Sequence, residues 1–176
     1  MLDFEKNYFE LFGLAPGFQL DLTQLEQSYR DMQAQVHPDK HAHLGDVERR
    51  QAMQWATHAN EAYQTLRQPL SRARYLLNLY GVPGDESSNT AMSRAFLMEQ
   101  MEWREAIIEA KDAEDVDELE HLSSRLRKET QQRLETLQRL LDVERDYPQA
   151  AEQVRELKFM EKLREEINFA LEALDA

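Results

Sequence analysis

Apolar residues recur with a helical period along every long segment of the chain, and no segment alternates as a half-buried strand does. Between residues 22 and 36 they step by three or four positions and form one helical stripe of Leu22, Leu25, Tyr29, Met32 and Val36. A second helix, which Asp46 can cap, is expected to bury Met53, Ala56, Ala59, Tyr63 and Leu66. The pattern therefore predicts an all-α protein.

Proline, glycine and short polar residues divide the chain into elements. Pro38 ends the helix before it, because proline disfavours helical geometry in the preceding residue. Shorter helices are expected over residues 4–12 and from Pro69 to about residue 80. A segment rich in Gly, Pro, Ser and acid, residues 81–90, predicts a linker between an N-terminal domain, 1–80, and a C-terminal domain, 91–176.

The C-terminal domain contains three longer helical patterns, roughly 90–111, 115–142 and 148–175, with short breaks between them. Such an arrangement is typical of an antiparallel three-helix bundle. The N-terminal domain is expected to be an antiparallel helical hairpin with short flanking helices, whose tip lies near Pro38.

Composition narrows the classes of function. The absence of cysteine excludes disulfides, zinc ribbons and a cluster held by this chain's own thiolates. The net charge is −13, and most of it lies after residue 80, which argues against nucleic acid or a membrane surface as a partner. No apolar run approaches the ~20 residues of a membrane-spanning helix. The acidic start of the chain lacks the features of a signal peptide, so a cytoplasmic location is expected.

The stretch QVHPDKHAHLG, residues 35–45, carries three histidines, an aspartate and a lysine. A metal site is disfavoured because all candidate ligands lie in one loop beside Lys40, so no metal and no cofactor are expected. His37 and Asp39 could act as an acid–base pair, but no nucleophile and no glycine-rich phosphate loop accompanies them in the sequence, so catalysis is not supported. Contact with a partner is the third reading, since an exposed Asp39 carboxylate can pair bidentately with an arginine.

Three motifs in order, NYFELFGL (7–14), HPDK (37–40) and NEAYQTL (60–66), resemble a J-domain, the module that docks on heat-shock ATPase chaperones of the DnaK type. The resemblance covers approximately residues 1–80. It implies that His37, Pro38 and Asp39 stimulate ATP hydrolysis by the chaperone, with Lys40 and Arg30 as further contacts. The chain itself would then be no enzyme.

The charge of the hairpin departs from that family. J-domains in general carry a basic face on the helix before HPDK, but between Asp21 and Val36 this sequence has only Arg30. Electrostatic steering toward an acidic chaperone surface should therefore be weak. This difference favours a specialised chaperone partner over the general one.

Residues 92–109 carry more apolar side chains than one core stripe needs. One row contains Met92, Phe96, Trp103 and Ile107, and a second contains Leu97, Met101 and Ile108 with Met98 at its edge. The second row is either buried against another element, which the pattern alone slightly favours, or an exposed surface that binds a protein. In the last helix, Phe159 falls about 90° from the centre of the core stripe, and Phe169 has no evident role.

The segments PLSRARYLL (69–77), AFLMEQMEWREAI (95–107) and LKFMEKLREEI (157–167) extend the resemblance to nearly the whole chain, which is similar to the HscB family of iron–sulfur cluster biogenesis. That family implies an IscU-type scaffold bound by the bundle and delivered to an HscA-type chaperone. The implied scaffold contacts are Leu97, Met98, Met101, Glu102, Glu105 and Phe159. The alternatives are a J-domain adaptor that brings another client to a general DnaK-type chaperone, self-association of the bundle, and a metal-dependent enzyme.

Overall fold

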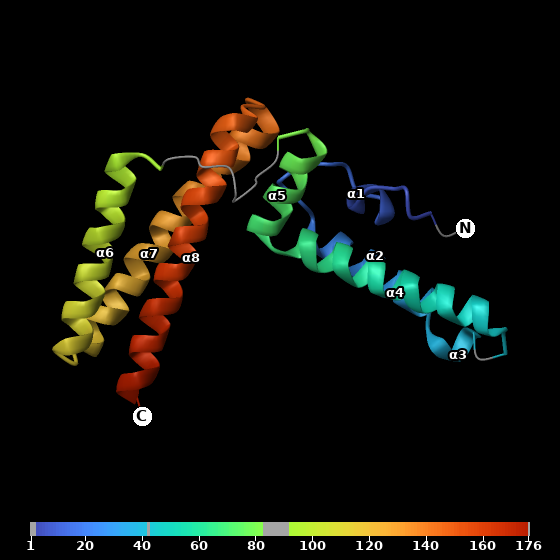
Figure 1. Ribbon diagram of the computed structural model, residues 1–176, viewed down its shortest axis with the longest axis horizontal. Coiled ribbons are helices and arrows are strands. Elements are labelled where there is room, and N and C mark those ends of the chain that lie inside the picture. The colour runs from blue at the N-terminus through green and yellow to red at the C-terminus, as the bar shows by residue number, and fades with distance from the viewer. Residues whose placement is uncertain (1–2, 42, 83–91, 176) are drawn as a thin grey trace. The chain divides into compact units, whose positions relative to one another are not determined.

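The computed structural model describes residues 3–41, 43–82 and 92–175, and these residues form helices joined by short connections, with no strand among them (Figure 1). The prediction of an all-α fold is confirmed. The chain divides into two compact units, Met1–Leu79 and Tyr80–Ala176. Most of the expected linker, residues 83–90, lies outside the described residues.

The N-terminal unit is built on a helical hairpin. Its elements are α1 (Tyr8–Leu11), α2 (Leu22–Gln35), α3 (Pro38–His41), α4 (Asp46–Arg67) and α5 (Pro69–Leu79). Helices α2 and α4 pack together along the hairpin, and α3 lies at its tip (Figure 1). Tyr29 of α2 stacks on Tyr63 of α4 with ring centroids 4.1 Å apart, and its hydroxyl donates to Oδ1 of Asn60 at 3.1 Å. These contacts fix the two helices against each other below the tip.

Local capping explains where these helices begin. Asp21 is the N-cap of α2, because its carboxylate accepts from the backbone N–H groups of Thr23 and Gln24. The first helix is shorter than the predicted 4–12, since Asn7 and Glu10 form a capping box that starts α1 at Tyr8. Gly45, and not Asp46, is the N-cap of α4, which leaves the Asp46 carboxylate to pair with Arg49.

The buried face of α4 is rotated from the predicted one. Of the five residues expected inside, Ala59 and Leu66 are buried, while Met53 is 69% exposed. The residues that are buried are Ala52, Trp55, Ala59, Ala62 and Leu66. Three of these five residues are alanines, and α1, α2 and α5 all pack against α4. Trp55 contacts Phe4 edge to face. The helical period alone could not distinguish these two neighbouring faces.

The N-terminal unit is closed by α5, which packs against α4. Arg72 is buried there, and its Nη1 donates to the backbone oxygen of Leu66 at 2.8 Å. Its guanidinium also lies over the ring of Phe18. Tyr75 stacks on Tyr8, and its hydroxyl oxygen accepts from the Tyr8 N–H at 2.8 Å. The short first helix is therefore held against α5.

The C-terminal unit is a bundle of α6 (Arg94–Asp112), α7 (Val116–Gln138) and α8 (Tyr147–Asp175), as the three predicted helical patterns indicate. Helices α6 and α8 run in the same direction, because their contacts keep a nearly constant offset in the sequence; they are Phe96–Phe159, Gln100–Met160 and Arg104–Glu166. Helix α7 is antiparallel to both (Figure 1). The core contains Trp103, Ile107, Leu119, Leu122, Leu126, Met160, Leu163 and Ile167.

A π-helical turn, η1 (Arg139–Val143), follows α7 directly. Two consecutive residues of this turn, Leu140 and Leu141, are both buried. Arg145 then adopts a positive φ of 53°, and Asp146 precedes α8. Helix α7 thus ends in a specific backbone feature that the apolar pattern did not predict.

Candidate functional site: a hairpin tip and the outer face of α6

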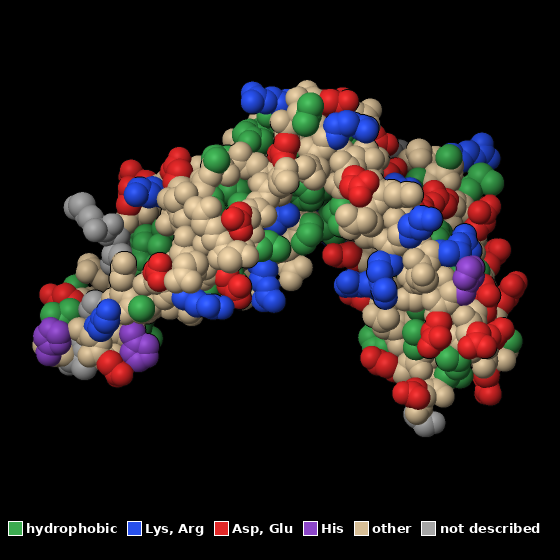
Figure 2. Space-filling view, turned by 180° about the vertical axis from the view of Figure 1, so that it is seen from behind, with side chains coloured by type: hydrophobic (Ala, Val, Ile, Leu, Met, Phe, Trp, Pro, Cys, Tyr) green, Lys and Arg blue, Asp and Glu red, His purple; other side chains and the backbone are tan. Residues whose placement is uncertain are grey.

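The hairpin tip, defined here as residues 37–40, lies at the end of the N-terminal unit. The side chains of His37, Asp39 and Lys40 are exposed, and that of Pro38 lies outside the described part of the chain. Histidine side chains gather at this end of the unit (Figure 2). Val36, the last residue before the tip, is buried and anchors the end of α2. The His37 side chain is 58% exposed and the Asp39 side chain 92% exposed. The Asp39 carboxylate is therefore open to a partner in solution.

Within the tip, His37 serves as the cap of α3. Its Nδ1 accepts from the backbone N–H of Asp39 at 3.2 Å, and its backbone oxygen accepts from the Lys40 N–H at 3.0 Å. The helix starts at Pro38, where a missing N–H costs nothing. Nδ1 also lies 3.5 Å from Oδ2 of Asp39. The same nitrogen can accept from the amide when it is unprotonated, or donate to the carboxylate when it is protonated.

The two basic residues assigned to the tip region differ in their surroundings. Lys40 is exposed in α3. Arg30 is exposed on α2 and pairs with Glu26 one turn earlier, 3.5 Å away. This pair reduces the positive field of α2 further. The structure thus brings His37, Asp39 and Lys40 together, while Arg30 lies two turns before them.

The outer face of α6, defined here as Leu97, Met98, Met101 and Ile108, is the second exposed surface. These side chains are 47%, 56%, 62% and 57% exposed, respectively. Phe96, Trp103 and Ile107, from the first row, are instead buried in the bundle. Of the two alternatives for the second row, the structure favours the exposed surface over burial. Glu102 and Glu105 are exposed on the same helix and give this face an acidic rim.

Phe159 of α8 contacts the helix that carries this face. It is half-buried, its ring meets Phe96 edge to face at a centroid distance of 6.3 Å, and Nζ of Lys162 is 5.3 Å from its centroid. Phe159 therefore joins α8 to the helix that carries the outer face. Phe169, whose role the sequence did not indicate, is 69% exposed on α8.

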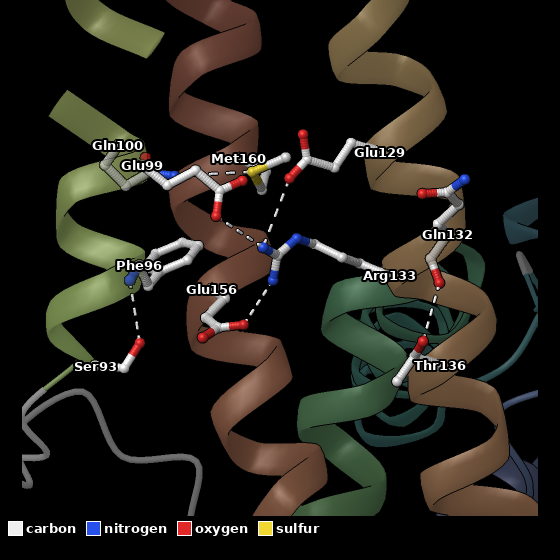
Figure 3. Close-up of polar contacts among 10 residues, drawn as sticks. All are labelled: Ser93, Phe96, Glu99, Gln100, Glu129, Gln132, Arg133, Thr136, Glu156 and Met160. Atoms are coloured by element: carbon white, nitrogen blue, oxygen red, sulfur yellow. Dashed lines mark hydrogen bonds and ion pairs between the residues drawn. The ribbon is translucent and has the colours of Figure 1, made fainter. Parts of the chain in front are cut away.

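A partly buried ion cluster lies behind α6, and the sequence pattern did not predict it. Arg133 of α7 contacts one carboxylate from each helix of the bundle (Figure 3). Its guanidinium lies 2.6 Å from Oε2 of Glu156 on α8, 3.6 Å from Glu99 on α6 and 3.6 Å from Glu129 on α7. The spacing of Glu129 and Arg133 by four residues was the only signal of this cluster in the sequence.

The charges of this cluster do not balance. Burial, followed by hydrogen bonding to Glu99 and by its negative charge, raises the pKa of Glu129 to about 7 despite the opposing effect of Arg133. Burial also raises the pKa of Glu156, against the charge and hydrogen bond of Arg133. One guanidinium thus faces more negative charge than it neutralises.

The described residues contain no group of three or more His, Asp or Glu side chains placed to hold a metal ion. Of the three loop histidines, the side chain of His41 lies outside the described part of the chain. None of the helices in the described ranges is both long enough and apolar enough to cross a membrane.

Comparison with known proteins agrees with this architecture of a helical hairpin and a three-helix bundle. The profile of the HSCB C-terminal oligomerisation domain matches residues 92–168. A co-chaperone protein HscB homologue of Azoarcus sp. strain BH72 is 53% identical over 174 residues, which cover 99% of this chain and 98% of the relative. A homologue from Burkholderia cenocepacia is 50% identical over 175 residues, 99% of each chain.

Solved structures of HscB proteins have the same fold. Chaperone HscB from Vibrio cholerae has a TM-score of 0.85 with 37% identity, over 96% of this chain and 99% of that one. The human co-chaperone protein HscB has a TM-score of 0.88 with 28% identity, over 96% and 83% of the two chains. The fold and these relatives place the chain among the helical co-chaperones. The chain belongs to the HscB family.

Proposed function

We propose that this protein acts in iron–sulfur cluster assembly as a co-chaperone with two binding surfaces. The hairpin tip stimulates ATP hydrolysis by an HscA-type heat-shock chaperone, and the outer face of α6 binds an IscU-type cluster scaffold. The ATP site belongs to the chaperone, so this chain is a regulator and not an enzyme. The observation that carries the proposal is that the two compact units each expose one such surface, the HPDK tip in one and an unpaired apolar row in the other.

The geometry of the tip supports its role toward the chaperone. The capping bond between His37 and the Asp39 N–H holds the α3 backbone, so the backbone that carries the exposed Asp39 carboxylate is already ordered before binding. A carboxylate in this position can accept two parallel hydrogen bonds from an arginine of the ATPase. His37 then acts by orienting the tip, and Lys40 supplies an adjacent positive charge.

The outer face of α6 supports binding of a protein partner. Leu97, Met98 and Met101 lie within two turns of one helix, and methionine side chains adapt to the shape of a partner. Phe159 borders the face through Phe96. The acidic rim favours a partner that carries basic residues around an apolar segment. A scaffold of this kind would be held by α6 with an edge contribution from α8.

The proposed division of labour follows the two domains, 1–80 for the chaperone and 91–176 for the scaffold, in a cytoplasmic setting. The weak basic character of α2, where Arg30 pairs with Glu26, supports a specialised chaperone over a general DnaK-type partner. The alternative is a J-domain adaptor that brings another client to a general DnaK-type chaperone. The experiment below distinguishes the two functions.

A bridging assay tests the proposal. Purified IscU-type scaffold is immobilised, this protein is added, and chaperone capture and ATP hydrolysis are measured. We expect Asp39→Asn to bind the scaffold but not to stimulate ATP hydrolysis, and the pair Leu97→Ala, Met101→Ala to lose the scaffold but retain stimulation. Failure of the native protein to bind the scaffold, or equal stimulation of a DnaK-type chaperone, would support the alternative adaptor role.

A further inference from the structure

We propose that Arg133 is a positioning residue for the outer face of α6, and that its ion cluster holds one proton on Glu129, next to Glu99, whose release loosens α6. The proton site concerns this chain alone. Its effect on binding rests on the proposed function, because it assumes that the outer face of α6 holds the scaffold.

The geometry places Arg133 at the centre of the bundle (Figure 3). Its side chain is only 18% exposed, and that of Glu156, its nearest partner, 11%. The Glu156 bond joins α7 to α8, and the Glu99 contact joins α7 to α6. One side chain thus links all three helices, and its Nε has no hydrogen-bond partner. If one carboxylate loses its contact with Arg133, the guanidinium is left to pair with the other two carboxylates alone.

The charges facing Arg133 require a proton. Three ionised carboxylates around a single guanidinium leave two uncompensated negative charges in a region that water only partly reaches. Glu152 on α8 adds a further negative charge near Glu156. A proton on the Glu129 carboxyl group replaces its repulsion from Glu99 with a hydrogen bond between the two groups.

This pair lies directly behind the outer face. Glu99 follows Leu97 and Met98 on α6, whereas Glu129 is on α7. The Arg133 guanidinium lies 5.2 Å from the ring centroid of Phe96, and Phe96 in turn contacts Phe159. Repulsion between the two deprotonated carboxylates would therefore push α6 away from α7 and change the position of Leu97 relative to Phe159.

The direction of the pH effect follows from linkage. The pKa of Glu129 is raised from 4.5 to about 7, so between these values the folded state keeps a proton that the unfolded state has lost. Stability from this proton is fully present below about pH 4.5 and falls as the pH rises through about 7. The raised pKa of Glu156 acts in the same direction.

The first experiment uses the full chain alone. Thermal unfolding is followed from pH 5.5 to 8.5 for the native protein, Glu129→Gln, and the control Glu135→Gln, which changes an exposed residue of the same helix. We expect the midpoint of the native protein and of the control to fall with rising pH. Glu129→Gln, whose amide can donate permanently to Glu99, should show a flatter profile and a higher midpoint than the native protein at pH 8.5. Equal pH profiles for Glu129→Gln and the native protein would overturn the proton site.

A direct titration avoids dependence on any variant. The side-chain carboxyl ¹³C signal of Glu129 in the native protein should titrate in the neutral range. A midpoint at the ordinary value for glutamate would contradict the proposal even if the variants were misfolded.

The second experiment measures scaffold affinity at pH 6.5 and pH 8. We expect affinity of the native protein to fall at least threefold at the higher pH, and that of Glu129→Gln to change less than half as much on a logarithmic scale. Strong binding without this difference would overturn the positioning role of the cluster. Absence of scaffold binding at both pH values, together with a neutral titration of Glu129, would contradict the proposed function and leave the proton site supported.

Discussion

The backbone N–H of Asp39 donates to Nδ1 of His37 at 3.2 Å, so the histidine caps the short helix that carries the aspartate. The bond spans only two residues, and it holds the backbone from which the exposed Asp39 carboxylate extends. It also gives the two side chains different tasks. His37 holds the tip, and Asp39 is the group left open to a partner.

The first prediction concerns Asp39. Replacement by Asn removes the charge and leaves the backbone bond to His37, so stimulation of the chaperone ATPase should fall by roughly tenfold or more, as expected for loss of a charged hydrogen bond of about 1.5–3 kcal/mol. Asp31→Asn, an exposed carboxylate of α2, is the matched control and should retain stimulation. Steady-state ATP hydrolysis across a range of co-chaperone concentrations provides the measurement. Native-like stimulation by Asp39→Asn would remove the tip from the mechanism.

The second prediction separates orientation by His37 from direct contact. His37→Asn keeps an acceptor that can cap the Asp39 N–H, whereas His37→Ala has none. If His37 acts by holding the tip, Asn should restore part of the stimulation that Ala loses. The ATPase assay decides between the roles, and equal loss in both variants would assign the imidazole a contact of its own.

The third prediction concerns the outer face of α6. Truncation of Leu97 or Met101 to Ala should weaken scaffold binding roughly 5- to 30-fold, the effect of removing about 1–2 kcal/mol of apolar contact. Val143→Ala truncates an even more exposed apolar side chain elsewhere on the bundle and should not alter affinity. Calorimetric titration gives the affinities, and circular dichroism checks that helicity is retained. If the control weakens binding as much as Leu97→Ala does, the surface is not specific.

The fourth prediction concerns the acidic rim. Glu102→Gln and Glu105→Gln are expected to reduce the association rate with the scaffold and its dependence on salt, with less effect on dissociation, because both side chains are exposed. Stopped-flow mixing at two ionic strengths measures this. A change confined to dissociation would indicate that these carboxylates form buried contacts in the complex.

The fifth prediction compares a buried leucine with an exposed isoleucine. Leu122→Ala in the core of the bundle should lower the free energy of unfolding by about 2–5 kcal/mol, and Ile108→Ala on the outer face by about 0.5 kcal/mol or less. The two tryptophans lie in different units, so Trp55→Phe leaves Trp103 as a fluorescent reporter of the bundle. Urea unfolding in that background measures the change. Similar losses from both substitutions would mean that Ile108 is covered in solution.

Much of the fold was predictable because the information was local. Helical periodicity, the proline at position 38 and the polar breaks in the second half gave the hairpin and three bundle helices with nearly correct bounds. The predictions were wrong or incomplete where the structure depends on contacts between elements that are far apart in the sequence. The buried face of α4 depends on the helices that pack against it, and the π-helical turn after α7 has no signal in the apolar pattern.

The chain by itself determined the residues of the tip and the two apolar rows of α6, because motif order and spacing are properties of sequence. Only the tertiary structure decided that one row is buried and the other exposed, since both rows are equally apolar and the difference is which one meets α7 and α8. It alone placed Glu99, Glu129 and Glu156 around Arg133. Those residues span 58 positions from first to last along the chain, and no periodicity within a single helix can report that three helices converge on one charge.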